Sequence, residues 1–131
     1  MAAETRYRAA HISDIPTYPS DLVEGEWKPV RYFFGISAFG ANVYVGRSPG
    51  ELVIEEHADD DHEELYVVLS GTARFTVDGD AFDAPAGTFV FVPTDVVRAA
   101  HAGEDGAAVL ALGAPPGSFE VSEWEKKRVT A

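Results

Sequence analysis

The sequence contains no cysteine, which excludes a disulfide framework, a thiolate metal site and a cysteine nucleophile. It also has no long hydrophobic run, because the longest, around Ala107–Ala114, is far too short to cross a bilayer. The opening residues, MAAETRYRAAHISDIP, include no uninterrupted apolar segment of the kind that a secretory signal needs. From these absences we expect a cytoplasmic protein without a membrane partner.

Basic residues are scarce as well, since 10 Lys and Arg stand against 22 Asp and Glu and give a net charge of −12. A surface this acidic repels phosphate backbones and anionic lipid, so we expect no nucleic-acid partner. The 131 residues, of which 46% are hydrophobic, are enough for one domain with a core of its own. The charge by itself indicates solubility rather than an acidic ligand site.

Residues 1–29 differ from the remainder of the chain. Pro16, Pro19 and Pro29 disfavour a long helix, whereas apolar residues such as Tyr18 and Trp27 argue against plain disorder. We therefore predict an extended N-terminal arm that packs either on the domain or on a partner subunit.

Residues 30–121 are predicted to form an all-β domain, because short segments rich in β-branched and aromatic residues alternate with turn residues. The predicted strands are Tyr32–Ile36, Asn42–Arg47, Leu52–His57, Glu64–Ser70, Thr72–Val77, Ala81–Ala84, Thr88–Val92, Val97–His101 and Ala107–Leu112. Asp78-Gly79 predicts a type I′ hairpin turn. Many short strands at near-regular spacing indicate an antiparallel sandwich or barrel. Residues 122–131 are predicted to be a short helix, since Ser122 and Glu125 form a capping box.

The segment from His57 to Gly71, HADDDHEELYVVLSG, holds the residues best suited to chemistry. Alternation along a strand places His62, Glu64 and Tyr66 on one face. If that face points into a barrel, a histidine and a carboxylate meet inside it, and His57 joins them from the preceding strand. Two imidazoles and one carboxylate make a facial-triad site with open coordination positions.

A plainer interpretation stays open for the same segment. Seven of the ten residues 55–64 are acidic, and runs of charge are usually solvated surface. In that case the histidines are incidental to an acidic loop.

The spacing of several residues resembles the cupin superfamily. Glu64, six residues and then Gly71 match the latter half of the first cupin motif, and His57 stands where its first histidine belongs. Gly87 and Pro93 match the second motif. The resemblance covers roughly residues 27–113, and it implies a double-stranded β-helix, which is an antiparallel jelly-roll barrel.

The sequence departs from the cupin pattern at most of the metal-ligand positions. Asp59 replaces the second histidine, Asp95 the glycine of P-x-G and Arg98 the histidine of the second motif. Arginine keeps its proton and is no metal ligand, so the usual site of three histidines and one glutamate is not expected here.

Two interpretations of the barrel interior therefore remain. In the first, His57, His62 and Glu64 bind one divalent metal (Fe, Mn, Ni or Zn), Asp59 assists and Arg98 orients an anionic substrate. In the second no metal is bound, and Arg98 neutralises the Glu64 carboxylate, because an unpaired buried charge is costly.

The resemblance implies a cupin that binds a small anionic molecule in its barrel, as a metal-dependent oxygenase or isomerase. The alternative is a noncatalytic small-molecule-binding or sensor cupin without metal. Candidate ligand-binding residues are Asp59, Glu64, Tyr66 and Arg98. We also predict a homodimer, because the strand containing Tyr66 is apolar on both faces and its outer face needs a cover.

Overall fold

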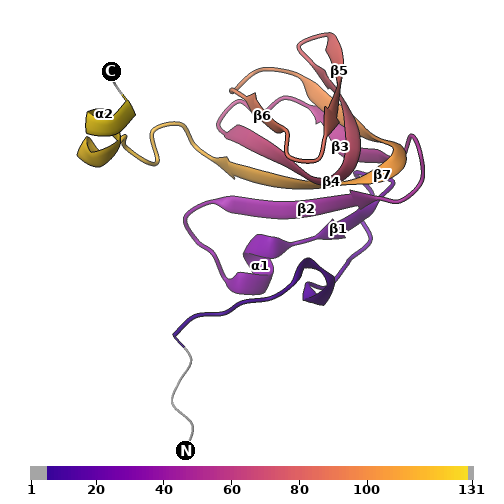
Figure 1. The fold of residues 1–131 in the computed structure, drawn as a ribbon, viewed down its shortest axis with the longest axis horizontal. Helices are drawn as coiled ribbons and strands as arrows, with labels where there is room; N and C mark the ends of the chain where they lie inside the picture. Colours follow the sequence, from indigo (N-terminus) through magenta and orange to yellow (C-terminus); the bar gives the residue numbers. More distant parts are fainter. Residues whose placement is uncertain (1–5, 130–131) are drawn as a thin grey trace, which may run out of the picture.

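The computed structural model describes residues 6–129 of the chain. Figure 1 shows antiparallel strands curled around one interior, with the N-terminal arm beside β1 and β2 and helix α2 set apart at the C-terminal end. The elements are η1 (Ile12–Asp14), β1 (Glu26–Lys28), α1 (Val30–Phe34), β2 (Gly40–Gly46), β3 (Leu52–His57), β4 (Glu63–Val77), β5 (Asp80–Pro85), β6 (Phe89–Val92), β7 (Arg98–Ala114) and α2 (Glu123–Val129). No helix within this part of the chain is long and apolar enough to span a membrane.

Two long strands, β4 and β7, organise the sheet. They pair with each other, β7 also pairs with β2 and β3, and β4 also pairs with β5 and β6. Every pairing is antiparallel. Because each long strand has different partners at its two ends, the sheet curls into a barrel, and this confirms the predicted antiparallel jelly roll.

Strands β4 and β7 bend where two glycines meet. The β4–β7 register shifts on both sides of this point, between Val68 and Ser70 and between Gly71 and Ala73. Gly71 has a φ of +68°, and a Cβ there would clash with the carbonyl oxygen of Gly106 on β7. Only glycine permits both the backbone conformation and this close approach.

The core follows the alternation expected of strands. On β4, Tyr66, Val68 and Phe75 are buried, while Leu69 on the opposite face is exposed. Tyr66 packs against Phe75 with ring centroids 5.7 Å apart. Burying such side chains supplies most of the favourable free energy of folding. The largest fully buried side chains are Arg98, Tyr66, Phe75, Val53, Val68, Val92 and Val109.

The predicted arm packs on the barrel of its own chain. Ile15 and Val23 are buried. Lys28 Nζ, also buried, donates to the carbonyl of Ile15 at 2.8 Å. Glu24 Oε1 accepts from the backbone N–H of Leu52 at 2.9 Å, which ties the arm to β3. Residues 1–5 of the predicted arm lie outside the described residues.

The predicted strand Tyr32–Ile36 is wrong, because most of it belongs to α1. Pro29 precedes this single helical turn, and Gly35 ends it in the left-handed conformation with φ of +73°. Proline at a helix start and glycine just after its end are the usual boundaries of a helix. These flanking residues outweigh the β-propensity of the aromatic sequence VRYFF.

Two local sequence signals are confirmed. Asp78 and Gly79 both have positive φ, as a type I′ hairpin requires, and they join β4 to β5. At α2 the backbone N–H of Glu125 donates to Ser122 Oγ at 3.1 Å, and Ser122 N–H donates to Glu125 Oε1 at 3.2 Å. This is the predicted capping box. Residues 130–131 of the predicted helix are outside the described range.

Candidate functional site

The candidate site lies where β3, β4 and β7 come together. His57 is the last residue of β3, and its backbone pairs with Arg98, the first residue of β7. The loop after β3 carries Asp59 and leads into Glu64 near the start of β4. The loop is held in place because the backbone N–H of Asp95 donates to the carbonyl of Asp59 at 2.7 Å.

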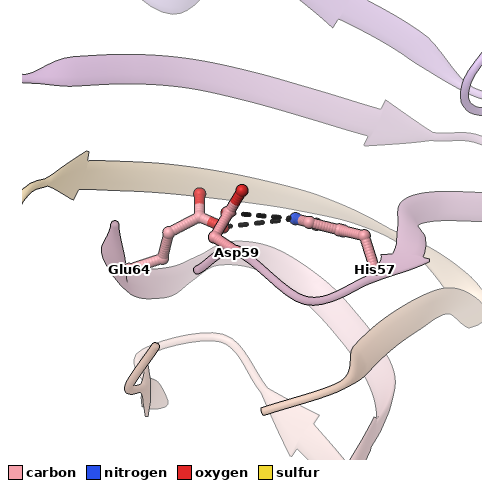
Figure 2. Close-up of side chains that lie close together, drawn as sticks. All are labelled: His57, Asp59 and Glu64. Carbon is pink, nitrogen blue, oxygen red and sulfur yellow. Dashed lines mark ion pairs between the residues drawn. The ribbon is translucent and has the colours of Figure 1, made fainter. Parts of the chain in front are cut away.

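His57 is oriented by its own strand. Its Nδ1 lies 2.7 Å from the carbonyl oxygen of Glu55, and a carbonyl only accepts, so Nδ1 carries the proton. Nε2 therefore points at two carboxylates, 3.5 Å from Asp59 Oδ2 and 3.4 Å from Glu64 Oε1 (Figure 2). Ligand atoms of these three residues all lie within 4.8 Å of one another.

The interaction with Glu64 is the largest cause that raises the pKa of His57 above its usual value, although burial acts in the opposite direction. Burial also pushes the pKa of the Glu64 carboxyl upward. The contacts with His57 and Tyr66 and the charge of Arg98 outweigh it and leave that pKa below its usual value. The cluster thus favours the charged form of both groups, a carboxylate at Glu64 and an imidazolium at His57.

Glu64 Oε1 is the atom on which the cluster converges. The Tyr66 hydroxyl donates to it at 2.9 Å, and Arg98 Nη2 lies 3.1 Å away. Burial and the negative charge of Glu64 raise the pKa of Tyr66, so its phenol stays protonated and remains a donor. This oxygen is consequently fixed in position from three sides.

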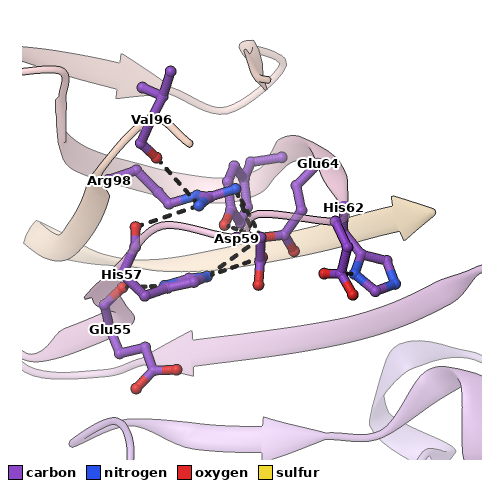
Figure 3. A network of polar contacts seen from close by, with 9 residues as sticks. Glu55, His57, Asp59, His62, Glu64, Val96 and Arg98 are labelled. Carbon is purple, nitrogen blue, oxygen red and sulfur yellow. Dashed lines mark hydrogen bonds and ion pairs between the residues drawn. The ribbon is translucent and has the colours of Figure 1, made fainter. Parts of the chain in front are cut away.

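Arg98 is a fully buried cation. Its Nη1 donates to the carbonyls of His57 and Val96, each at 3.3 Å (Figure 3). Nη2 is close to Glu64, yet its N–H bonds do not point at the carboxylate, and neither Nη2 nor Nε has a directed hydrogen bond within residues 6–129. The contact with Glu64 is therefore an ion pair, and Arg98 offers no surface to a molecule arriving from solvent.

Two of the cavities that Glu64 lines also contain other predicted site residues. The outer one has a volume of about 280 Å³, and its lining includes the carboxylates of Asp59 and Glu64 together with His62, Arg31 and Asn42. The inner one measures only about 80 Å³, room for a few water molecules. Its lining includes Leu22, Val23, Tyr44, Ile54, His57, Glu64 and Tyr66. Burial, together with the charges of Glu64 and Glu55, raises the pKa of Tyr44 to about 12.

A model of the cupin domain family matches residues 43–112, which is more than half of the chain. The chain belongs to the cupin family. No curated protein matches the sequence.

Solved cupins share the fold of this one at low sequence identity. A cupin protein from Bacteroides fragilis has a TM-score of 0.72 at 18% identity, over 93% of this chain and 95% of its own. A predicted oxalate decarboxylase from Thermotoga maritima has a TM-score of 0.69 at 17% identity, over 82% of this chain and 99% of its own. A putative sugar phosphate isomerase from Acidithiobacillus ferrooxidans has a TM-score of 0.61 at 24% identity, over 68% and 58%.

The structure of this cupin brings together five of the six residues predicted for the site: His57, Asp59, Glu64, Tyr66 and Arg98. It does not bring His62 to them. His62 Nδ1 lies 2.8 Å from Asp61 Oδ1, and its side chain is 45% exposed. The predicted alternation does not apply to His62, because β4 begins only at Glu63. His62 therefore lies on the wall of the outer cavity, and Asp59 takes its predicted place beside His57.

Residues Arg31 and Asn42 of the outer cavity were not predicted to belong to the site. Arg31 lies on α1, one residue before the predicted strand Tyr32–Ile36, so alternation gave no direction for its side chain. Asn42 alternates with the buried residues Ala41 and Val43 of β2. A polar residue beside buried ones on a strand next to the site was the only signal available.

One departure from the cupin pattern has a direct structural explanation. Asp95 stands where the pattern has the glycine of P-x-G, and its φ is +65°. This left-handed conformation favours glycine, and aspartate is among the few other residues that adopt it. The turn before β7 is thus retained, with its N–H bound to the loop that carries Asp59.

Proposed function

We propose that this cupin binds a small anionic molecule in its outer cavity, and that His57, Asp59 and Glu64 hold one divalent metal ion (Fe, Mn, Ni or Zn) at the inner wall. The observation that carries the proposal is the orientation of His57. Its Nδ1 is fixed by a backbone carbonyl, which leaves the Nε2 lone pair facing two carboxylate oxygens. Imidazoles that bind metals typically have this kind of hydrogen bond behind them.

The distances from His57 to the two carboxylates fit a shared metal ion. Two ligand atoms that each lie about 2.1 Å from a common ion are about 3.4 Å apart at a tetrahedral angle. Nε2 of His57 lies 3.5 Å and 3.4 Å from the oxygens of Asp59 and Glu64. Two carboxylates and the guanidinium of Arg98 sum to one negative charge around a neutral imidazole, which favours a cation.

A metal in this place would supply a Lewis acid with open coordination positions, as oxygenases and isomerases use. The chain's own residues would do the remaining work. Arg98 and Tyr66 fix the Glu64 oxygen. Arg31, on the wall of the outer cavity, is an accessible cation for an anionic group. Structural neighbours described as a putative sugar phosphate isomerase and a predicted oxalate decarboxylase are in keeping with an anionic substrate.

A second candidate function is a noncatalytic cupin that binds or senses a small molecule without metal. The ion pair between Arg98 Nη2 and Glu64 Oε1, 3.1 Å apart, favours it, because Arg98 neutralises Glu64 with no further ion. In this case the proton on His57, rather than a metal, balances Asp59.

The test is metal analysis of protein purified without chelator and without added metal. We expect about one divalent ion per chain. His57→Gln should lose it, while the matched control His62→Gln should keep it, because His62 is not part of the group. Circular dichroism checks that both variants fold. Metal-free wild-type protein would favour the noncatalytic cupin. Equal loss of metal in both variants would contradict the assignment of His57, Asp59 and Glu64 as the metal-binding group.

We also propose that the protein is a cytoplasmic homodimer. The outer face of β4 and β6 exposes large apolar side chains, including Leu69, Phe89 and Phe91. A patch of this kind marks a contact surface, and two-fold symmetry is the commonest way to cover it. Light scattering at micromolar concentration should give about twice the chain mass of 14.1 kDa. Charged substitution of both Phe89 and Phe91 should then yield a monomer.

A further inference from the structure

A second, larger hollow adjoins the outer cavity. It has a volume of about 810 Å³, and its lining residues come mainly from β1, α1 and the segment that follows α1. Arg31, Ser37 and Asn42 line both hollows, so the two share a wall. We call the larger one the aromatic groove. Its remaining lining residues are Tyr18, Trp27, Pro29, Tyr32, Gly35 and Ile36.

The aromatic walls of the groove are held rigidly. Tyr18 and Trp27 exchange backbone hydrogen bonds of 2.8 Å and 3.3 Å, and their ring centroids lie 6.1 Å apart. Trp27 Nε1 donates to Asn42 Oδ1 at 2.9 Å, which fixes the indole against β2. Because the rings are already in place, a flat apolar group can stack there with little loss of conformational freedom.

Arg31 supplies a positive charge at the shared wall. Its Nε donates to the carbonyl of Ile36 at 3.0 Å, and this orients the guanidinium. Among residues 6–129 no carboxylate forms an ion pair with it, although this chain has more than two acidic residues for each basic one. Its Nη groups suit a planar carboxylate, which can accept two parallel hydrogen bonds. Asn42 uses its oxygen for Trp27, so its amide N–H groups remain as further donors.

We propose that the ligand of this cupin is an aromatic carboxylate. Its ring lies in the aromatic groove against Tyr18 and Trp27, and its carboxylate binds Arg31 at the boundary with the outer cavity. This inference rests on the proposed function, since it names the class of anionic molecule held beside the His57 cluster. A compact anion without a ring would leave the groove unused.

The test is a calorimetric titration of the metal-loaded protein with 2-naphthoate, which carries both features. We expect saturable binding that is at least about tenfold tighter than that of acetate, which lacks the ring, or of 2-naphthylmethanol, which lacks the charge. Arg31→Gln should weaken the binding of 2-naphthoate by about tenfold or more. The matched control is Arg47→Gln, because Arg47 is equally a surface arginine but pairs with Glu26 away from the groove.

The contribution of the aromatic groove is tested by Tyr18→Ser, which removes a half-exposed ring. This variant should bind 2-naphthoate more weakly but bind acetate as wild type does. The inference is overturned if 2-naphthoate binds no more tightly than acetate, or if Arg31→Gln and Arg47→Gln bind it equally. These results leave the metal content untouched, so the proposed metal site would stand. Conversely, Arg31-dependent binding of 2-naphthoate by a protein that holds no metal supports the groove and contradicts the metal site.

Discussion

Strand β4 carries a member of two arginine–carboxylate pairs, one inside the barrel and one on its surface. Glu64, near its start, lies 3.1 Å from Arg98 of β7, and Arg74, near its end, lies 2.9 Å from Asp83 of β5. The side chains of the inner pair are 0% and 18% exposed, whereas those of the outer pair are 56% and 65% exposed. The two contacts are alike in length and opposite in surroundings.

The difference shows that burial, rather than distance, decides what an ion pair does. In the surface pair, water solvates both charges when they separate, so the pair contributes little. In the inner pair, Arg98 has no access to water. Removal of either partner therefore leaves the other as a buried charge without a counter-charge. The inner pair is therefore a constraint that fixes Glu64 beside His57, and the surface pair is dispensable.

The largest expected effect is that of Arg98→Ala. It leaves the half-buried Glu64 carboxylate without its cation, so we expect a loss of about 3–5 kcal/mol in the free energy of unfolding. Urea denaturation measures it. The double variant Arg98→Met with Glu64→Gln removes both charges and should recover most of the loss. An Arg98→Ala variant as stable as wild type would contradict the conclusion that burial makes the Arg98–Glu64 pair essential.

The comparison of the buried pair with the surface pair can be sharpened by measuring the free energy of unfolding of chelator-treated protein as a function of pH. The pKa of His57 is raised above 6.5, so its contribution to stability is fully present below about pH 6.5 and is lost as the pH rises through the higher folded value. The stability difference between wild type and His57→Gln should shrink over that window. Glu64 is the largest cause of the raised pKa of His57. When the same comparison is made in protein that carries Glu64→Gln, the stability difference should therefore change less with pH.

Glu64 gives the opposite sign in acid. Its folded pKa lies below 4.5, so its contribution is present above that value and disappears as the pH falls through the folded value. The stability advantage of wild type over Glu64→Gln should therefore decrease below about pH 4.5. Urea denaturation at a series of pH values follows both windows, and a constant difference would contradict the pKa directions.

The smallest expected effect is that of Arg74→Ala, in the range of about 0–1 kcal/mol. Both partners of Arg74 and Asp83 are exposed, so salt should weaken what little coupling there is. Urea denaturation at low and high ionic strength measures both. If Arg74→Ala lowered the free energy of unfolding as much as Arg98→Ala, burial would not be what distinguishes the two pairs.

The fold was largely predictable from the sequence because its signals are local. Asp78-Gly79 specifies a hairpin turn, and Ser122 with Glu125 specifies a helix start, without reference to distant residues. The wrong assignment at Tyr32–Ile36 came from weighing aromatic β-propensity above the flanking Pro29 and Gly35, which set the boundaries of α1.

The site was predictable only in part, since it depends on where chain segments meet. His57 and Glu64 followed from motif spacing, and the opposition of Arg98 to Glu64 followed from the cost of burying an unpaired carboxylate. His62 was placed wrongly, because its position was predicted from strand alternation and the strand β4 begins only at Glu63. The aromatic groove combines the arm, α1 and β2, and no single stretch of sequence carries the signature of such a combination.

The pairing of β4 with β7 also bears on the order in which the molecule folds. At one end of this ladder Val77 faces Arg98, 21 residues further along, and at the other Glu63 faces Ala114, 51 residues further along. The entropy lost on closing a loop grows with its length, so pairing is expected to start beside the β4–β5 hairpin and advance toward Glu64. Glu64, one of the residues proposed to bind metal, would then be among the last on this ladder to reach its native position during folding.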